Sequence, residues 1–424
     1  MVRTQRAAAT VDRRRSARRD RSLPVSPVLD TLFYFMSERH QVFLRRTEGD
    51  ERPWTEDATL GRYPFTNVFR VYDRTTQYIL RHVIGEGSQD LTESCFRVIL
   101  FRMFNKIETW KYLQKQVGEI TWDSFDVYTY EQVLTAVEGP LYGFAYICPA
   151  PTNIGGGKIN CARHLRLVQL LMEENLPKQL QRCRYLKDAH GWLRLFPSMG
   201  DFTALQLALD LNMLPHFKWS EDEWVTPGPG AKAALRKIFG PGVAAVELEA
   251  IQWLHATQDE HFSRLGIPVD RRPRLCASRR PGVSMVDLEH SLCECDKYSR
   301  AVHPEIRGKR VKVAKHEFVP HPHRPTANLP AHWLRAPQRR IRLTHPPAVR
   351  REDGVVKWEI HRIVAEHGDG APQYVLRWTG YGPDDDTCQP EKDLVGDAEE
   401  VLNAWKSMKQ RIRKKMHDKA QFLC

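Results

Sequence analysis

Apolar side chains recur at helical spacing in three stretches of the first 200 residues. The first stretch follows Ser26-Pro27, a pair typical of a helix start, because a serine hydroxyl caps free backbone N–H groups and proline fits the first turn. The same periodicity predicts helices over about residues 91–113 and 162–175. Period-two alternation is scarce before residue 350, and residues 141–147 are ambiguous. We therefore expect residues 26–300 to form a mostly helical domain, with these apolar faces as its core.

The pattern changes near the end of the chain. Residues 358–364 and 373–378 alternate between apolar and polar positions as strands do, and a glycine-rich turn separates them. A last helix is predicted from about residue 397 to 409. The expected fold class is therefore a mainly α N-terminal domain followed by a small β-sheet-and-helix module over residues 354–410.

Basic segments flank these two units. Residues 1–25 form an arm in which eight arginines precede Leu23 against two aspartates, so the arm is either a nuclear-import or phosphate-binding segment or a solubilising tail. Residues 301–353 form a linker rich in proline, histidine, lysine and arginine, a composition typical of extended chain. Residues 411–424 form a basic tail.

Composition narrows the classes of partner. The formal charge of +12 and the pI near 9.3 favour polyanions such as DNA. The nine cysteines follow no disulfide framework and no zinc spacing, so we expect a reducing compartment and no metal site. No apolar run of about 18 residues and no apolar signal core are present, so we expect neither a membrane partner nor secretion.

The C-terminal module carries a specific motif, WEIHRIV…YVLRWTGYGPDDDT…PEKDL. It resembles the chromodomain, in which three aromatic residues box a methylated lysine; the matching positions are Trp358, Trp378 and Tyr381. Ring faces attract a methylammonium group that cannot form strong hydrogen bonds. The resemblance implies a methylated histone tail as partner and a nuclear location. Cys388-Gln389 replace the usual Trp-Glu, which leaves open a module that kept the fold and lost the ligand, or that binds a partner protein.

Polar residues concentrate among aromatics at YPFTNVFRVYDR, residues 63–74. Arg70 and Arg74 would share a helical face at i,i+4, with Asp73 between them. This arrangement is either a structural ion pair or a guanidinium fork for a phosphate or a base edge. Asn67 belongs to the same group.

Two further motifs contain glycine. LFPSMGDFTA, residues 195–204, resembles a helix-hairpin-helix element that grips DNA phosphate, with Gly200 in the turn and Ser198 in place of the usual first glycine. Taken alone it is equally an ordinary helical turn. Gly228 and Gly230 lie in a Pro-Gly loop ahead of a helix over residues 233–239. Neither this loop nor residues 155–158 has the spacing of a phosphate-binding P-loop.

Taken in order, RYPFTNVFRVYDR, FRMFNKIETW, FPSMGDFTALQLALDLN, GPGAKAALRKIFG and VDLEHSLCECDKYSR resemble the helical domain of phage 5-hydroxymethyluracil DNA kinases, also called the alpha-glutamyl/putrescinyl-thymine pyrophosphorylase-like family. The resemblance spans about residues 30–300 and implies a helix-hairpin-helix DNA glycosylase-like fold that acts on hydroxymethylated thymine in DNA. The implied DNA- or base-binding positions are Asn67, Arg70, Asp73, Arg74, Gly200, Gln206, Gly228, Gly230, Glu289 and Asp296, and the implied catalytic candidates are Asp210 and Lys297.

This chain departs from the family by lacking a P-loop kinase domain. In base-excising relatives a catalytic carboxylate follows the hairpin, and here that window offers residues 221–223, with Asp222 as the candidate.

The resulting hypothesis is a nuclear, chromatin-targeted protein that binds DNA and acts on a flipped, hydroxymethyluracil-type base by transferase, pyrophosphorylase-like or glycosylase-like chemistry. The alternative is a non-catalytic adaptor with a degenerate glycosylase-like domain. The sequence does not identify a cofactor or cosubstrate.

Overall fold

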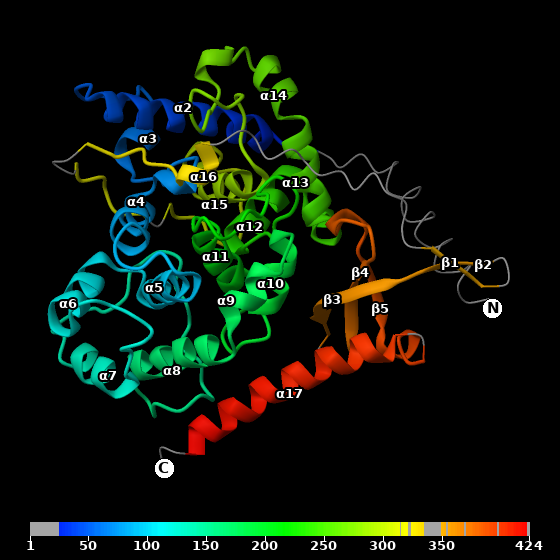
Figure 1. Ribbon diagram of the computed structural model, residues 1–424. Coiled ribbons are helices and arrows are strands. Elements are labelled where there is room, and N and C mark those ends of the chain that lie inside the picture. Colours follow the sequence, from blue (N-terminus) through cyan, green and yellow to red (C-terminus); the bar gives the residue numbers. More distant parts are fainter. Residues whose placement is uncertain are drawn as a thin grey trace.

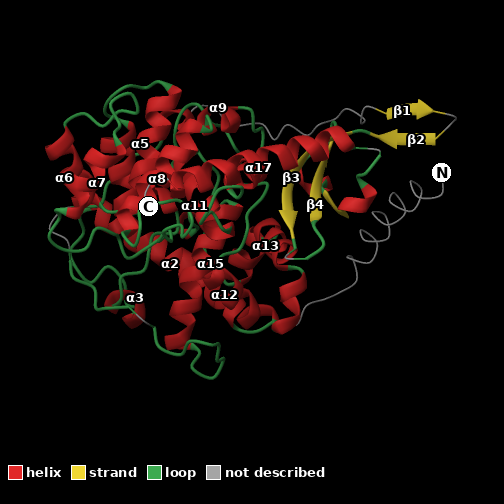
Figure 2. Ribbon diagram, turned by 90° about the horizontal axis from the view of Figure 1, so that it is seen from below, coloured by secondary structure: helices red, strands yellow, loops and turns green. Residues whose placement is uncertain are grey.

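A computed structural model describes residues 25–313, 315–320, 324–334, 349–352, 355–368, 370–396 and 398–421. Most of these residues form a helical body, and a small antiparallel sheet with a long final helix lies beside it (Figures 1 and 2). The expectation of a mainly helical chain with a small sheet near its C-terminus is confirmed. Almost all of the predicted basic arm, residues 335–348 of the predicted linker and the last three residues lie outside the described residues.

The helices of the body come first in the chain, and the strands follow them. The α-helices are α2 (Val28–Glu48), α3 (Ala58–Arg62), α4 (Arg74–Tyr78), α5 (Leu91–Phe104), α6 (Ile107–Val117), α7 (Val127–Thr135), α8 (Asn160–Glu173), α9 (Leu176–Gln181), α10 (Leu186–Leu193), α11 (Asp201–Leu211), α12 (Pro229–Phe239), α13 (Glu247–Ala256), α14 (Gln258–Arg264), α15 (Met285–Val302), α16 (Ala331–Leu334) and α17 (Glu399–Gln421). The shorter turns used below are the 3-10 helix η1 (Arg70–Tyr72) and the π-helix η2 (Ile79–Ile84). The strands are β1 (Val349–Glu352), β2 (Val355–Trp358), β3 (Ile360–His367), β4 (Gln373–Trp378) and β5 (Thr387–Pro390).

Two of the three helices predicted from periodicity are confirmed, and one is wrong in length. Helix α2 begins where the Ser26-Pro27 pair predicts, and the Val28 N–H donates to Ser26 Oγ at 3.2 Å. Helix α8 matches the third stretch. The second stretch forms two helices, α5 and α6, because Asn105 takes a left-handed conformation with φ of 45°. Its side chain donates to the Ala145 carbonyl, which stabilises the break.

Helix α15 packs against α12, α2 and α13 and so lies at the centre of one half of the body (Figure 1). Its Leu288, Leu292 and Cys295 are fully buried, which is expected of a helix that other helices cover on several sides. The approach to α12 is close at Gly230, where an added Cβ would lie 2.3 Å from Cys293 Sγ. Glycine at this position therefore permits the packing of α12 on α15.

The described part of the predicted linker lies on the helical body and does not stand off as a free tether. Lys315 forms an ion pair with Glu294, and the Phe318 N–H donates to the Arg62 carbonyl. Gln77, from α4, bonds to the backbone of Asn328 through both its amide nitrogen and its amide oxygen. Apart from the short helix α16, the described residues between 303 and 334 have no regular structure, as their proline content predicts, but polar partners and apolar contacts fix the path of the chain.

The sheet that closes the chain has the order β3-β4-β5 and is antiparallel throughout. Strands β1 and β2 form a separate two-stranded ribbon. Helix α17 packs on β3, where Trp405 Nε1 donates to Glu366 Oε2 at 2.9 Å. The helix runs to residue 421, beyond the predicted end near 409. Along this length it also contacts α8 of the helical body.

The sheet is fixed to the helical body through α10. The Arg377 side chain, only 2% exposed, forms ion pairs with Asp188 of α10 at 3.1 Å and with Asp386. At Gly191 the two elements are so close that an added Cβ would lie 1.6 Å from the Val364 carbonyl oxygen. Further along, Arg411 of α17 bonds Glu174 at 2.9 Å. Ion pairs therefore hold the module against the body at both places, and the pair between Arg377 and Asp188 is fully buried.

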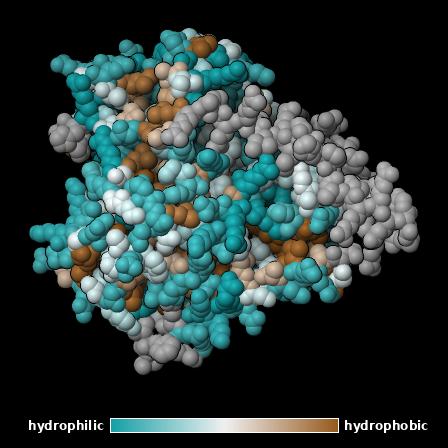
Figure 3. All heavy atoms as spheres, viewed as in Figure 1, coloured by the Kyte–Doolittle hydropathy of each residue, from teal (hydrophilic) through white to brown (hydrophobic). Residues whose placement is uncertain are grey.

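The visible face of the molecule is largely hydrophilic, with hydrophobic residues in small separate patches (Figure 3). Of the helices in the described residues, not one combines the length and the apolar character needed to span a bilayer.

Candidate functional site

Two arginines meet one carboxylate in the interior of the helical body. Arg70 of η1 donates from Nη2 to Asp210 Oδ1 at 2.6 Å, and Arg102 of α5 binds Oδ2 of the same carboxylate. Gln206, one turn earlier on α11, accepts from Arg70 Nε at 3.1 Å. Asp210 is fully buried. With both oxygens held, Asp210 positions the two guanidinium groups and touches no solvent.

Tyr146 covers this group. It comes from the loop between α7 and α8, where it takes a left-handed φ of 53°. Its ring centroid lies 5.2 Å from the Arg70 guanidinium carbon and 5.9 Å from that of Arg102. Among the described residues, Arg102 Nη1 is buried without a hydrogen-bond acceptor. We call Arg70, Arg102, Gln206, Asp210 and Tyr146 the Arg70 cluster.

Aromatic rings extend from Tyr146 on both sides. Phe202 lies nearly parallel to it, with an interplanar angle of 14° and centroids 6.5 Å apart. His290 of α15 lies on Tyr146 at 6.0 Å and 21°. Tyr146 Oη lies 3.1 Å from His290 Nδ1, and burial with the nearby Asp73 carboxylate raises the pKa of Tyr146 well above its usual value. The tyrosine therefore stays protonated and can donate a hydrogen bond.

Asp73 connects His290 to the first predicted motif. Its Oδ2 lies 3.6 Å from His290 Nε2, and its Oδ1 accepts the Asn67 backbone N–H at 2.9 Å. Burial lowers the pKa of His290, but the hydrogen bond and charge of Asp73 outweigh it, so the pKa is raised. The Asn67 side-chain oxygen accepts from Arg39 at 2.7 Å, and its amide nitrogen donates to the Tyr72 carbonyl.

Glu294, one turn beyond His290 on α15, is the centre of a second ion-pair group. It accepts the Thr66 backbone N–H and binds Lys297 and Lys315. Burial alone would raise its pKa, but the ammonium groups of Lys315 and Lys297 lower the pKa of Glu294 to about 2. The predicted catalytic candidate Lys297 is therefore engaged by a carboxylate that stays charged, rather than poised as a free amine.

Two carboxyl groups with raised pKa values lie on the other side of Arg70. Asp287 Oδ1 accepts the Arg70 backbone N–H at 3.3 Å, and Glu221 Oε1 accepts from Asn212 Nδ2 at 3.1 Å. Burial raises the pKa of Glu221 to about 8 and that of Asp287 to about 6, and each retains some contact with solvent. Both can therefore exchange a proton near neutral pH.

Two predicted site residues lie elsewhere. Arg74 does not share a face with Arg70, because Asp73 between them has an extended ψ of 143° that ends η1 before α4 begins. Arg74 is exposed and lies 3.7 Å from Glu108. Asp222 is exposed in its turn, 3.5 Å from His255 Nε2, whereas its neighbour Glu221 faces the protein.

The remaining predicted positions have structural partners. Gly200 precedes α11 with an extended backbone, and the left-handed residue of that turn is Ser198, with φ of 61°. The Gly228 N–H donates to Glu289 Oε1 at 2.8 Å, and an added Cβ there would lie 3.0 Å from the Phe202 ring. Asp296 is buried in ion pairs with Lys237 and Arg300. Together with Gly230, these residues support the packing of α11, α12 and α15.

The residues of the site that were not predicted are Arg102, Tyr146, Phe202, Asp287 and His290. All of them except Tyr146 occur within motifs quoted from the sequence: Arg102 in FRMFNKIETW, Phe202 in FPSMGDFTALQLALDLN, and Asp287 and His290 in VDLEHSLCECDKYSR. Buried arginine at position 102 was a usable signal, because it interrupts an otherwise apolar helix face. Tyr146 had no local signal.

Three aromatic residues gather at one end of the C-terminal sheet. Trp358 Nε1 donates to Tyr381 Oη at 3.2 Å, and the Tyr381 N–H donates to the Trp378 carbonyl. Trp378 pairs with Ile360 across the sheet and donates to Thr387 Oγ1. None of the three is buried, and Trp358 is 36% exposed. All three therefore keep some contact with solvent at the same end of the sheet.

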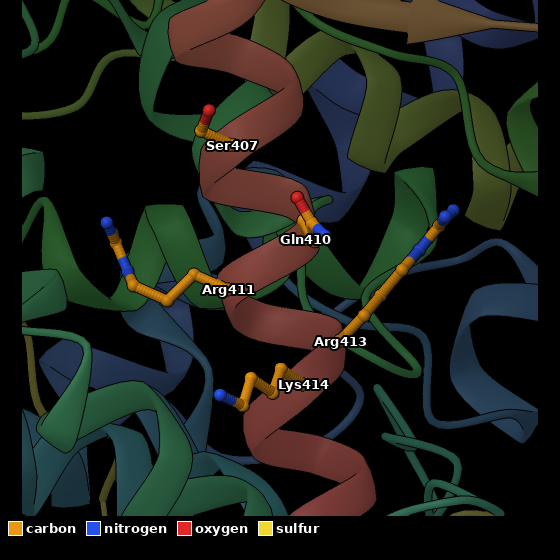
Figure 4. A pocket seen from close by; sticks show the side chains of 5 residues that line it. All are labelled: Ser407, Gln410, Arg411, Arg413 and Lys414. Carbon is orange, nitrogen blue, oxygen red and sulfur yellow. The ribbon is translucent and has the colours of Figure 1, made fainter.

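A basic surface groove of about 530 Å³ runs along the outer face of α17 (Figure 4). The cations on the inner side of this helix are paired, Lys406 with Glu391, Lys409 with Glu366, and Lys415 with Glu174. Arg413 and Lys414 are exposed, and neither forms an ion pair with a described residue. The groove is lined by Ser407, Gln410, Arg411, Arg413 and Lys414.

Among the described residues, no three His, Cys, Asp or Glu side chains lie close enough together to hold a metal ion.

Comparison with known proteins identifies the helical body. The family model for "5-hmdU DNA kinase, helical domain" matches residues 26–308. A 5-hmdU DNA kinase of Bacillus phage SP10 is 22% identical over 314 residues, which cover 67% of this chain and 47% of the relative. The chain thus spans about half the length of that curated relative. No solved structure matches. Because the family model covers more than half of the sequence, the chain belongs to the 5-hmdU DNA kinase helical-domain family.

Proposed function

We propose that the helical body binds DNA and takes a pyrimidine base of the 5-hydroxymethyluracil type into contact with the Arg70 cluster. The relative from Bacillus phage SP10 is named for that nucleoside, and the matched residues 26–308 contain the whole cluster. The observation that best supports this proposal is that the rings of Tyr146 and Phe202 lie nearly parallel, and that Tyr146 lies beside two buried guanidinium groups.

The ring geometry supports base binding. A base between two aromatic faces needs about twice the ~3.4 Å separation of stacked bases. The centroids of Tyr146 and Phe202 lie 6.5 Å apart, and the separation of the ring planes is no larger than that, so the two rings must move apart to admit a base between them. Buried Arg102 Nη1, which has no acceptor among the described residues, offers a donor for a pyrimidine carbonyl or hydroxymethyl oxygen. A base reaches such a position only after leaving the stack.

The neighbouring groups supply proton-transfer capacity. Glu221 and Asp287, with pKa values raised to about 8 and about 6, flank Arg70 and can act as acid or base near neutral pH. Asp210 holds the arginines, and Lys297 is engaged by Glu294. We therefore assign the acid–base role to Glu221 and Asp287 in place of Asp210, Lys297 and Asp222.

Nucleoside mass spectrometry tests whether this domain is an enzyme. The full chain is incubated with duplex DNA containing 5-hydroxymethyluracil, with and without nucleoside triphosphates, and the digested nucleosides are weighed. We expect a mass change or base release that Glu221→Gln abolishes and Glu260→Gln, an exposed change on α14, does not. Unaltered DNA under every condition, with binding of the duplex retained, would favour the rival function, a non-catalytic DNA-binding adaptor.

The three aromatic residues of the C-terminal sheet support a second proposal, that this module is a chromodomain-like reader of methylated lysine on a histone tail and acts in the nucleus. The supporting observation is that Trp358 and Tyr381 touch each other on one accessible edge beside Trp378. A methylammonium group would gain a ring contact from each, at about 0.5–2 kcal/mol per contact. Peptide binding to methylated and unmethylated tails tests this directly.

A further inference from the structure

The most exposed large hydrophobic side chain of the described residues is Phe144, at 95%. A single exposed apolar side chain is common on protein surfaces. Phe144 differs because its loop is held on both sides and leads directly to Tyr146. Phe144 lies two residues before Tyr146 in the loop between α7 and α8.

The backbone around Phe144 is held firmly. Leu141 accepts from Thr109 Oγ1 at 2.7 Å, and the Gly143 N–H donates to the Phe104 carbonyl at 2.9 Å. The Ala145 carbonyl accepts from Asn105 Nδ2 at 2.9 Å. Gly143 lies so close to Asn105 that an added Cβ would be 2.3 Å from its carbonyl oxygen.

Side chains on either side are also engaged. Tyr142 stacks on Phe104 with centroids 5.5 Å apart and bonds His164, while Tyr146 lies over Arg70. The break between α5 and α6 at Asn105 therefore serves as the platform for this loop. Phe144 is presented from a fixed support, and its exposure does not arise from a loosely held loop.

We propose that Phe144 is a wedge that enters the base stack of duplex DNA and occupies the space left by the nucleotide that moves to Tyr146. This inference rests on the proposed binding of a flipped base. An apolar side chain inserted between base steps unstacks them and compensates the lost stacking with its own ring contacts. The two-residue spacing from Tyr146 places the wedge beside the destination of the flipped base.

The experiment uses the full chain and a duplex with a single 5-hydroxymethyluracil next to 2-aminopurine, whose fluorescence rises when it is unstacked. We expect wild type to raise the fluorescence, Phe144→Ala to abolish the rise and lower affinity by about tenfold, and Phe144→Trp to retain both. The salt dependence of binding should be the same for all three, because phosphate contacts do not involve Phe144.

Tyr128→Ala is the matched control, since Tyr128 is a surface aromatic on α7 that is 55% exposed. It should bind and unstack DNA as wild type does, and thermal unfolding should be unchanged in every variant. Equal fluorescence rises for wild type and Phe144→Ala would overturn the wedge while leaving the proposed function intact. Failure of wild type to bind either this duplex or an unmodified one would overturn both.

Discussion

The Tyr146 ring lies 5.2 Å from the Arg70 guanidinium carbon. A residue of the loop between α7 and α8 therefore covers a buried cation of η1, which is far away in the sequence. Tyr146 therefore completes the cluster, and in the proposed function its ring also stacks on the base. We expect Tyr146→Ala to weaken binding of 5-hydroxymethyluracil duplex by about tenfold, which is the loss of one base–aromatic stack. Tyr146→Phe, which keeps the ring, should retain most of the affinity. Loss of affinity in the phenylalanine variant equal to that in alanine would show that stacking is not the role of this residue.

Asp210 should be essential for stability. Asp210→Asn leaves the guanidinium groups of Arg70 and Arg102 buried without a compensating charge, and breaking such a pair costs about 3–5 kcal/mol. We expect the free energy of unfolding in urea to fall by about that amount. Asp201→Asn, which removes an exposed carboxylate paired with Arg194, should change it by less than about 1 kcal/mol. A stable Asp210→Asn protein would mean that the arginines find other acceptors.

Glu221 should make stability depend on pH. Burial raises its pKa from 4.5 to about 8, so the folded protein binds this proton more tightly than the unfolded chain does. Its contribution is fully present below about pH 4.5 and is lost as the pH rises through about 8. Unfolding free energies measured at about pH 5 and about pH 9 should therefore fall less for Glu221→Gln than for wild type. An identical fall in both would place the titration elsewhere.

Trp358 is the best test of methyl-lysine binding, because it is the most exposed of the three aromatic residues, at 36%. Its loss should not disturb the sheet. Trp378 also donates to Thr387, so its replacement combines binding with stability. We expect Trp358→Ala to abolish binding of a trimethyl-lysine histone peptide in calorimetry, while Trp253→Ala on α13 leaves it unchanged. Wild-type affinity that is equal for methylated and unmethylated peptides would contradict the proposal.

The outer face of α17 should contribute phosphate contacts. Replacing Arg413 and Lys414 by alanine should reduce the slope of log affinity against log salt by about 2, because each phosphate contact contributes about 0.9. Lys406→Ala/Lys409→Ala removes the same charge from residues that already pair with Glu391 and Glu366, and should change the slope little. Equal slopes for the two double variants would assign the effect to net charge alone.

Periodicity was sufficient to predict the start of α2 and the extent of α8, since both depend on local spacing of apolar residues. It missed the break at Asn105, where one left-handed residue outweighs a continuous apolar stripe. The family resemblance gave Asn67, Arg70, Asp73 and Gln206 as base-binding positions and Asp210 as a catalytic candidate. Hydrogen bonds join these five residues into one network, whereas the other candidate Lys297 pairs with Glu294.

The errors have a common cause. Helical spacing predicted that Arg70 and Arg74 would lie together, but one extended dihedral at Asp73 separates them. Tyr146 and Arg102 reach the cluster through tertiary packing. The spacing of residues within one helix cannot predict contacts of that kind. The expectation of a free linker also failed for residues 315–320 and 324–334, because Lys315 and Asn328 have partners far away in the sequence.

The central claim is that the Arg70 cluster recognises a hydroxymethylated pyrimidine in DNA. The most direct measurement is competition between two duplexes that differ only by 5-hydroxymethyluracil or thymine at one position, with the full chain at fixed salt. Selective recognition by buried donors predicts that the modified duplex competes about tenfold better, a difference of about 1.4 kcal/mol. Indistinguishable competition by the two duplexes would contradict the account.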